Sequence, residues 1–250
     1  MPLSDSELVR YKRHLLLKEV GGAGQQRLKA ARVLVVGAGG LGAPCLLYLA
    51  AAGVGTLGLV DDDTVELSNL QRQVLYTTAD LGRPKAEAAA ERLAALNPDI
   101  RIESHPVRLT AETAGDLLAP YDLVCDGSDS YATRRAVNAA AMALGRPLVS
   151  AAVGRFEGQL ALFRGRPCYR CLFPHAPPGE DRCAADGILG TVAGLLGVMQ
   201  ASLVLDTLLG LSGEAAGRLH LVDAVALSVR HVRIGPDPGC PDCAGMETGS

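Results

Sequence analysis

The sequence contains no tryptophan, and aromatic residues make up only 4% of its 250 residues. Proteins that bind single-stranded nucleic acid stack bases on aromatic side chains, and this sequence offers few such platforms. It also lacks an excess of positive charge, because the formal net charge at pH 7 is −3. A nucleic-acid-binding domain would carry a basic stripe. We therefore expect no nucleic acid among the partners of this protein.

The features of a secreted protein are also missing. The amino terminus, MPLSD, has no apolar stretch of the kind found in signal peptides, and the seven cysteines are an odd number. Secreted domains that depend on disulfides usually carry a leader and paired cysteines. These absences predict a reducing, cytoplasmic location.

Two stretches, 33–60 and 188–205, carry no charged residue. Glycines divide the first stretch at the spacing of strand, turn, helix, turn and strand, which predicts a buried βαβ unit. The second stretch is long enough to cross a membrane, but glycines recur in it at helical spacing and polar residues interrupt it. We expect a buried or subunit-interface helix there, and no membrane partner.

A glycine-rich turn follows the β-branched run at 33–36, which is suited to a buried strand. Glycines let the backbone turn tightly and present amide groups to phosphate oxygens at a helix N-terminus. Asp61 ends the apolar strand at 57–60, at the spacing of the acidic residue that bonds a ribose in such units. The sequence therefore predicts nucleotide binding, with a merely structural turn as the alternative. The candidate glycines are Gly37, Gly39, Gly40 and Gly42.

Two cations, Arg72 and Lys85, follow the ribose aspartate. A dehydrogenase needs only backbone amides for a pyrophosphate that stays intact. Fixed cations, in contrast, lower the barrier when charge builds on a reacting triphosphate. The alternative for each residue is a solvated surface cation. Their position after Asp61 favours the first interpretation, which is a nucleotide that is cleaved.

A second apolar strand, at 123–126, also ends in an aspartate. This residue, Asp126, is followed by Gly127, Ser128 and Asp129. Ligands bind where strands end at one edge of a doubly wound sheet. Mg²⁺ suits a single carboxylate together with waters and triphosphate oxygens. The alternative is that an aspartate caps the helix expected at 131–144. We expect Asp129 to bind Mg²⁺ and Asp126 to be the helix cap.

Four of the cysteines form two Cys-x-x-Cys pairs that could supply four thiolates to a structural zinc ion. A redox pair and two disulfides are the alternatives, but neither motif opens a helix in a thioredoxin-like setting. Four thiolates leave no open coordination position, so we expect the zinc to lie away from the chemistry. The candidate zinc ligands are Cys168, Cys171, Cys240 and Cys243.

The other three cysteines differ in their surroundings. Cys183 lies in a loop that contains glycine and charged residues, beside Arg182, which favours a thiolate. Reactive chemistry and a spectator thiol are both open for Cys183. Cys45 and Cys125 lie in apolar segments and are expected to be small core residues.

The order of segments predicts an α/β fold with a Rossmann-like, doubly wound and mostly parallel sheet, followed by an antiparallel carboxyl-terminal extension. The chain is 48% hydrophobic and long enough to bury one large core. We expect a helical arm over 1–30 and a single nucleotide-binding domain over 31–250, with its terminus held by zinc. Strands are predicted near 33, 57, 100–106, 123, 147–150, 158–163, 219–223 and 227–234, and helices at 84–96 and 131–144.

These motifs, taken in order, cover nearly the whole chain. With this set of motifs, the sequence resembles the ubiquitin-activating-enzyme-like adenylyltransferases of bacterial sulfur-transfer pathways, the family that includes MoeB and ThiF. The matching segments are 10–13 (RYKR), 37–42, 60–63, 68–73, 82–85 and 126–129, with both cysteine pairs and the region of Cys183.

The resemblance implies a homodimeric enzyme whose domain 31–250 is an adenylation domain. It would use Mg·ATP to activate the C-terminal glycine carboxylate of a small β-grasp sulfur-carrier protein with a Gly-Gly tail, giving an acyl-adenylate and pyrophosphate. Arg13 would reach into the site of the neighbouring subunit. Ser130 stands where the family commonly has Asn and lacks its amide donor. The implied nucleotide and Mg²⁺ contacts are Gly40, Asp61, Ser68, Asn69, Leu70, Gln71, Arg72, Lys85, Asp129 and Ser130.

Two other functions are also compatible with the sequence. A nicotinamide oxidoreductase would need only the glycine turn, and a non-catalytic ATP-binding scaffold would keep the glycines and the zinc but tolerate loss of Arg72 and Lys85. The sequence does not decide between the molybdenum-cofactor, thiamine and tRNA-thiolation pathways. No rhodanese-type segment follows Cys243, so a separate protein is expected to donate the sulfur.

Overall fold

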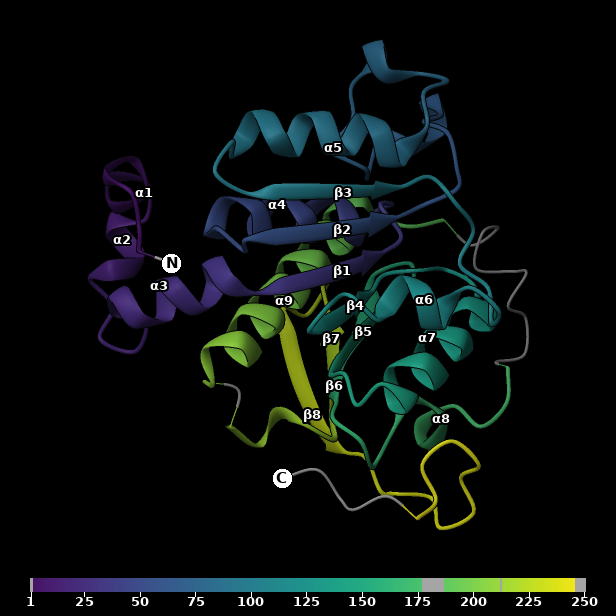
Figure 1. Cartoon of the computed structure of the whole chain (residues 1–250). Helices are drawn as coiled ribbons and strands as arrows, with labels where there is room; N and C mark the ends of the chain where they lie inside the picture. The colour runs from purple at the N-terminus through teal and green to yellow at the C-terminus, as the bar shows by residue number, and fades with distance from the viewer. Residues whose placement is uncertain (1, 177–186, 212, 246–250) are drawn as a thin grey trace.

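The computed structural model describes residues 2–176, 187–211 and 213–245. Eight strands of these residues form one sheet in the order β3-β2-β1-β4-β5-β6-β7-β8, with helices on both faces (Figure 1). The strands are β1 Arg32–Val36, β2 Thr56–Val60, β3 Arg101–His105, β4 Leu123–Asp126, β5 Leu148–Val153, β6 Glu157–Phe163, β7 Arg218–Asp223 and β8 Ser228–Arg233. The helices are α1 Asp5–Arg10, α2 Lys12–Leu15, α3 Gly21–Ala30, α4 Gly42–Ala52, α5 Lys85–Leu96, α6 Ala114–Leu118, α7 Tyr131–Ala143, α8 Tyr169–Leu172 and α9 Gly190–Leu209, with short 3₁₀ helices η1 Leu67–Asn69, η2 Thr78–Asp80 and η4 Gly213–Ala215.

The first half of the sheet is parallel. β1 pairs with β2 and β4, and β3 and β5 extend the parallel set on either side. The side chains of β2 and β4 are all buried, as expected for apolar strands covered on both faces. The five parallel strands end at one edge, where doubly wound sheets bind ligands. The predicted Rossmann-like sheet is therefore confirmed.

The second half of the sheet is antiparallel. β6 pairs with β5, β7 with β6, and β8 with β7, all in antiparallel register. β8 is the edge strand, and each of its residues is exposed, which suits its polar sequence, SVRHVR. The predicted antiparallel extension is confirmed.

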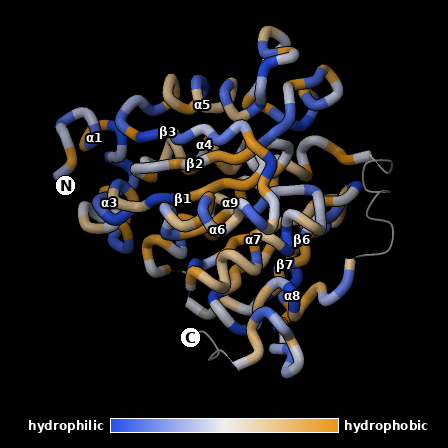
Figure 2. The backbone as a smooth tube through the Cα atoms, turned by 45° about the vertical axis from the view of Figure 1, so that its right-hand side comes forward, coloured by the Kyte–Doolittle hydropathy of each residue, from blue (hydrophilic) through white to orange (hydrophobic). Residues whose placement is uncertain are grey.

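Two helical layers enclose the sheet and divide the core. α4, α5 and α9 contribute the side chains buried against one face, and α6, α7 and α8 contribute those buried against the other. Figure 2 shows hydrophobic colour along β1 and β2 in the interior and mostly hydrophilic colour over α3 at the margin. The parallel strands thus lie between two apolar layers.

α9 is, within the described ranges, the one helix long and apolar enough to cross a membrane, but half of its most apolar window is buried inside the protein. It packs against α4, β5 and β6. A side chain at Gly197 would place its Cβ 2.3 Å from the carbonyl oxygen of Leu41, so glycine allows the two helices to approach closely. α9 is therefore a half-buried helix of the core, and whether its other face meets a second subunit stays a prediction.

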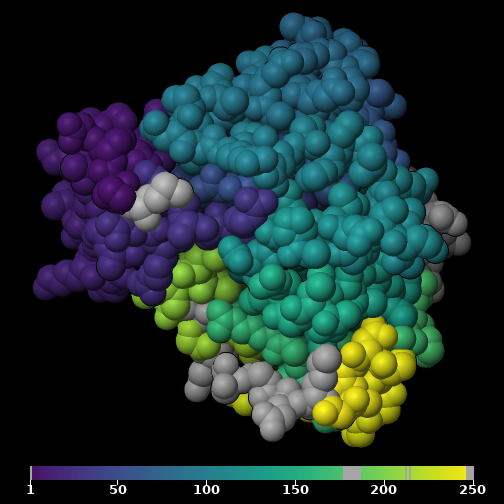
Figure 3. All heavy atoms as spheres, in the orientation of Figure 1, coloured from purple at the N-terminus to yellow at the C-terminus, as the bar shows by residue number. Residues whose placement is uncertain are grey.

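The amino-terminal arm consists of three short helices, α1 to α3, that form a lobe at the margin of the molecule (Figure 3). Buried Asn97 donates from Nδ2 to the hydroxyl of Tyr11 at 2.9 Å and to the carbonyl of Ala50 at 2.7 Å. Buried Gln25 bonds His14 at 2.9 Å and donates to the carbonyl of Ala52 at 2.9 Å. These bonds attach the arm to the end of α4.

Candidate nucleotide site

The glycine turn joins β1 to α4 at the carboxyl edge of the sheet. Gly37 has φ of +85°, a left-handed conformation that favours glycine. A side chain at Gly42 would place its Cβ 1.8 Å from the carbonyl oxygen of Gly37, so only glycine lets α4 begin so close to the strand. The turn has the tight geometry that brings backbone amides to a phosphate.

Asp61 lies directly after β2, beside this turn. Its carboxylate accepts hydrogen bonds from the backbone amides of Ala38, at 2.7 Å, and Asp63, at 2.9 Å. Burial raises the pKa of this carboxyl, while the positive charge of Lys85 acts in the opposite direction. A carboxylate offers about four lone-pair positions, so Asp61 still has capacity for a ribose hydroxyl.

Lys85 is the first residue of α5 and is brought to the same place. Its ammonium donates to the carboxylate of Asp63 at 2.7 Å, and its backbone amide donates to the carbonyl of Asp63 at 2.9 Å. The side chain of Lys85 is only 6% exposed. Because a buried ammonium needs a negative partner, this cation is fixed at the mouth of the turn.

Arg72 follows η1 and approaches the turn from the other side. Its guanidinium donates to the carbonyl of Ser68 at 3.0 Å. A Cβ built at Gly40 would lie 3.5 Å from Cγ and Cδ of Arg72, which places the arginine stem over the turn. The structure therefore brings Arg72 and Lys85 to the same glycine loop.

Of the rest of the segment 68–73, Gln73 lies against the turn. Asn69 is buried and Leu70 is half-buried, whereas Ser68 and Gln71 are exposed. Gln73 is buried, its Nε2 lies 3.5 Å from a Cβ built at Gly39, and its Oε1 has no hydrogen-bond partner among the described residues. An unpaired buried acceptor is costly unless a ligand or water meets it, so its position fits a nucleotide site.

The loop after β4 adjoins the turn, since a Cβ built at Gly37 would lie 3.1 Å from the carbonyl oxygen of Gly127. The prediction that Asp126 caps α7 is wrong. Asp126 is fully buried and accepts from the amide and hydroxyl of Ser128, at 3.0 and 2.7 Å, and from the hydroxyl of Ser150 at 3.3 Å. A carboxylate engaged in this way stabilises the loop and is not free to reach the helix.

The cap of α7 is Ser130, whose hydroxyl accepts from the amide of Thr133 at 3.4 Å. Asp129, one residue before it, is exposed at the carboxyl edge of the sheet. A single exposed carboxylate near the glycine turn fits Mg²⁺, which keeps several waters and takes few protein ligands. The residues present therefore fit the ion at Asp129.

One predicted residue, Arg13, is not brought to this place. Arg13 is exposed on α2, and Figure 1 shows α2 at the amino-terminal edge of the parallel strands, opposite the start of α5. Within one chain, Arg13 cannot join Arg72 and Lys85. Cys183 lies outside the described residues.

Three residues that the sequence analysis did not assign support the site. The hydroxyl of Tyr76 donates to the carbonyls of Ala38 at 2.9 Å and Lys85 at 3.3 Å. Gln200 on α9 donates to the carbonyl of Asp126 at 2.7 Å, and Arg134 on α7 donates to the carbonyl of Ser128. A lone glutamine within the uncharged stretch 188–205 was the available signal for Gln200. The other two bonds join residues whose pairing no sequence pattern indicates.

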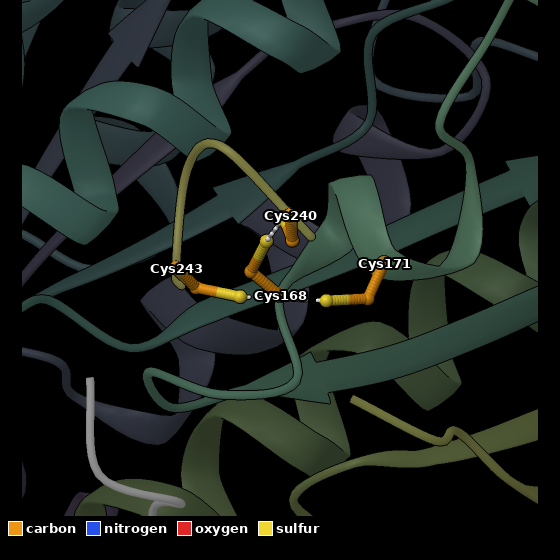
Figure 4. A group of neighbouring side chains, drawn as sticks. All are labelled: Cys168, Cys171, Cys240 and Cys243. Atoms are coloured by element: carbon orange, nitrogen blue, oxygen red, sulfur yellow. Dashed lines mark hydrogen bonds between the residues drawn. The ribbon is translucent and has the colours of Figure 1, made fainter. Parts of the chain in front are cut away.

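The four predicted zinc ligands meet as one cluster (Figure 4). Their sulfurs all lie within 4.8 Å of one another, with Cys168 to Cys240 at 3.7 Å and Cys171 to Cys243 at 3.4 Å. Tetrahedral zinc with Zn–S bonds of about 2.3 Å places sulfurs about 3.8 Å apart. The cluster could therefore hold zinc, and Figure 1 shows it, at α8 and the loop after β8, at the opposite end of the molecule from α5.

Polar neighbours fix these cysteine loops. Asn138 on α7 is fully buried and donates from Nδ2 to the carboxylate of Asp242 at 3.0 Å, with the sulfur of Cys168 at 3.7 Å. Arg170 forms an ion pair with Asp242 at 2.7 Å. Such outer contacts orient the ligands of a metal site.

Comparison with known proteins gives consistent matches. The model of the ThiF family matches residues 11–242. The chain is 50% identical to the sulfur carrier protein adenylyltransferase of Thermus thermophilus, covering 99% of this chain and 95% of that protein. It is 45% identical to the adenylyltransferase and sulfurtransferase MOCS3 of Anopheles gambiae, and 46% identical to the probable adenylyltransferase/sulfurtransferase MoeZ of Mycobacterium tuberculosis. It covers 57% and 63% of these two longer proteins, and they cover 98% and 96% of this chain.

Solved structures share the fold at lower identity. A crystal structure of E. coli MccB superposes with a TM-score of 0.82 at 20% identity, covering 99% of this chain and 75% of that one. The crystal structure of PaaA gives a TM-score of 0.79 at 24% identity, covering 93% of this chain and 75% of that one. At these identities the similarity establishes the architecture of the sheet and its helices.

Proposed function

The chain belongs to the ThiF family, and we propose that it is an adenylyltransferase that activates a sulfur-carrier protein. Its relative from Thermus thermophilus carries that activity in its name and is matched over nearly its full length. The observation that carries the proposal is the position of Lys85 and Arg72. Arg72 lies beside the glycine turn at Gly40, and Lys85 pairs with Asp63 and lies close enough to Asp61 for its charge to act on that carboxyl. This is where a bound triphosphate would place its charge.

The reaction we propose begins with the carboxylate of the carrier's C-terminal glycine. One oxygen of this carboxylate attacks the α-phosphorus of ATP, the bond from that phosphorus to the bridging oxygen breaks, and pyrophosphate leaves. The products are the acyl-adenylate of the carrier and pyrophosphate. The nucleophile belongs to the substrate, so the protein contributes binding, orientation and charge stabilisation.

The residues divide these tasks. The amides of the glycine turn would receive phosphate oxygens, and Asp61 would bond the ribose. Lys85 and Arg72 would stabilise the charge that moves onto the departing pyrophosphate. Asp129 would hold Mg²⁺, which supplies further neutralisation of the triphosphate when it is bound.

Arg13 acts, in this proposal, on the site of a second copy. Its helix lies at the edge of the sheet opposite Lys85, so the chain cannot deliver it to its own nucleotide. A homodimer in which each arm reaches the partner would complete two sites. Subunit exchange tests this point: mixing the Arg13→Ala and Lys85→Ala chains would restore activity in one site of each mixed dimer.

The test of the proposed activity is exchange of labelled pyrophosphate into ATP, measured with each diglycine-tailed β-grasp carrier of the source organism in turn. We expect exchange only when the correct carrier is present. Lys85→Ala should lower the exchange rate by about 10²–10³-fold, as loss of one stabilising group at a charged transition state does. Lys18→Ala, which removes an exposed lysine of the arm, is the matched control and should exchange at the wild-type rate.

The other two functions give different results in the same assay. A nicotinamide oxidoreductase would bind NAD and show no exchange with any carrier. A non-catalytic ATP-binding scaffold would bind ATP equally well with and without Lys85. Wild-type protein that never exchanges pyrophosphate in the presence of these carriers would contradict the adenylyltransferase.

A further inference from the structure

We propose that Asp63 is the resident counter-ion of Lys85, and that the phosphates of the nucleotide must displace it on binding. Asp63 would thereby set the affinity of the site for a triphosphate. The inference rests on the proposed function, because it takes the incoming ligand to be ATP. It assigns a role to a residue that has no place in the reaction described above.

The ion pair between Lys85 and Asp63 is strongly asymmetric in exposure. The side chain of Lys85 is 6% exposed, whereas that of Asp63 is 68% exposed, and their charged atoms lie 2.7 Å apart. Lys85 is therefore the fixed member, held where solvent cannot replace a counter-charge. Asp63 is the member that can move into water at little cost.

The backbone holds the two residues together whichever partner Lys85 takes. The amide of Lys85 donates to the carbonyl of Asp63 at 2.9 Å, and the amide of Val65 donates to the carbonyl of Arg83 at 2.9 Å. These bonds form a short clamp between the segment after β2 and the segment before α5. Only the carboxylate of Asp63 has to rotate away when an anion enters.

The neighbouring Asp61 is held by other donors. Its carboxylate already accepts from the amides of Ala38 and Asp63, at 2.7 and 2.9 Å. Among the residues that the structure describes, Lys85 is the one group that donates to the carboxylate of Asp63. A phosphate oxygen that replaced this single bond would leave no other donor unpaired.

If Lys85 exchanges Asp63 for the phosphates, removing the charge of Asp63 should change the affinity for the nucleotide. With Asp63→Asn the triphosphate no longer competes with a carboxylate for Lys85, and one negative charge beside the phosphates disappears. We expect Mg·ATP to bind about fivefold more tightly, the size of effect typical of one partly exposed ion pair. Adenosine, which has no phosphate, should bind with unchanged affinity.

The experiment is calorimetric titration of the full chain with Mg·ATP and with adenosine, without carrier, so that no turnover occurs. The matched control is Asp62→Asn, which removes the same charge from the adjacent exposed residue and should change the affinity for Mg·ATP less than twofold. Asp63→Ser provides a second variant should the amide side chain disturb folding, and it should also bind Mg·ATP more tightly.

Weaker or unchanged binding of Mg·ATP by both Asp63 variants would overturn the inference, because Asp63 would then contact the nucleotide or its metal, or play no part. Equal tightening by Asp62→Asn would also overturn it, since general electrostatics would explain both results. Failure of the wild-type chain to bind Mg·ATP at all would instead contradict the proposed function.

Discussion

At the scale of single residues, the glycine turn and the polar groups around it leave little freedom for substitution. The turn is closed by Asp61 at Ala38 and by the hydroxyl of Tyr76 at the carbonyl of the same residue. Tyr76 also bonds the carbonyl of Lys85. One small group of hydrogen bonds thus links the glycine turn to Lys85.

Gly42→Ala tests the close approach of α4 to the turn. The added Cβ would lie 1.8 Å from the carbonyl oxygen of Gly37, so the helix or the turn must shift. We expect the free energy of unfolding to fall by about 1–3 kcal/mol, the range for overpacking of a buried site, and Mg·ATP binding to weaken. Denaturant titration and calorimetry measure the two effects.

The matched control for this substitution is Gly115→Ala on α6, where no atom lies within 4 Å of the added Cβ. An exposed helical glycine replaced by alanine should leave ATP binding unchanged and raise stability by up to about 1 kcal/mol. If Gly42→Ala were as stable and as active as Gly115→Ala, the turn would not require glycine at this position.

The structure also differs from the sequence-based prediction at single residues. Asp126 and Ser130 both have side chains that cap helices, and the spacing from residue 131 does not separate them. Asp126 is instead engaged by the amide and hydroxyl of Ser128 and by the hydroxyl of Ser150, which lies on another strand. A local pattern of strand, turn and helix, in contrast, fixes the positions of Gly37 and Asp61. Arg72 and Lys85 were chosen from their place after Asp61, and the nucleotide contacts of these residues stay a prediction.

At the scale of elements, most strands and helices follow from periodicity and composition. β1, β2 and β4 are short apolar runs with glycine or aspartate at their ends, and α7 begins and ends within one residue of the range predicted. The arm was harder to predict, because α1, α2 and α3 are held by Tyr11, Gln25 and Asn97. Those contacts join residues far apart in the sequence.

The two cysteine loops form an element whose stability we expect to depend on zinc. Cys243→Ser should lose the bound metal, measured as zinc content per chain by elemental analysis, and should lower the unfolding temperature, since metal binding contributes to folding. A chelator should lower the unfolding temperature of the wild type towards that of the variant. It should have no further effect on Cys243→Ser.

Cys45→Ala is the control for this prediction. Cys45 is a buried core residue whose sulfur lies 3.5 Å from that of Cys125, outside the four-cysteine cluster. The variant should lose some stability to the cavity it creates but retain a full complement of zinc. Equal zinc content in wild type and Cys243→Ser would contradict a metal site at the cluster.

At the scale of the whole molecule, the sheet separates three tasks in space. The carboxyl edge of the parallel strands carries the glycine turn, Asp61 and Lys85, and the opposite edge carries the arm with Arg13 (Figure 1). The cysteine cluster lies at α8 and the loop after β8. In the proposed homodimer, this arrangement would let a second copy supply Arg13 without disturbing the cysteine cluster. The location of Arg13 relative to Lys85 depends on the path of the chain across the sheet, which local sequence patterns do not specify.

The most direct measurement is the mass of the carrier protein after incubation with this enzyme and Mg·ATP. The carrier should gain the mass of one adenylyl group while pyrophosphate is released, and Lys85→Ala should greatly reduce the fraction modified. An unmodified carrier with release of ADP and phosphate, or equal modification by wild type and Lys85→Ala, would contradict a site in which Lys85 stabilises cleavage of ATP between its α- and β-phosphates.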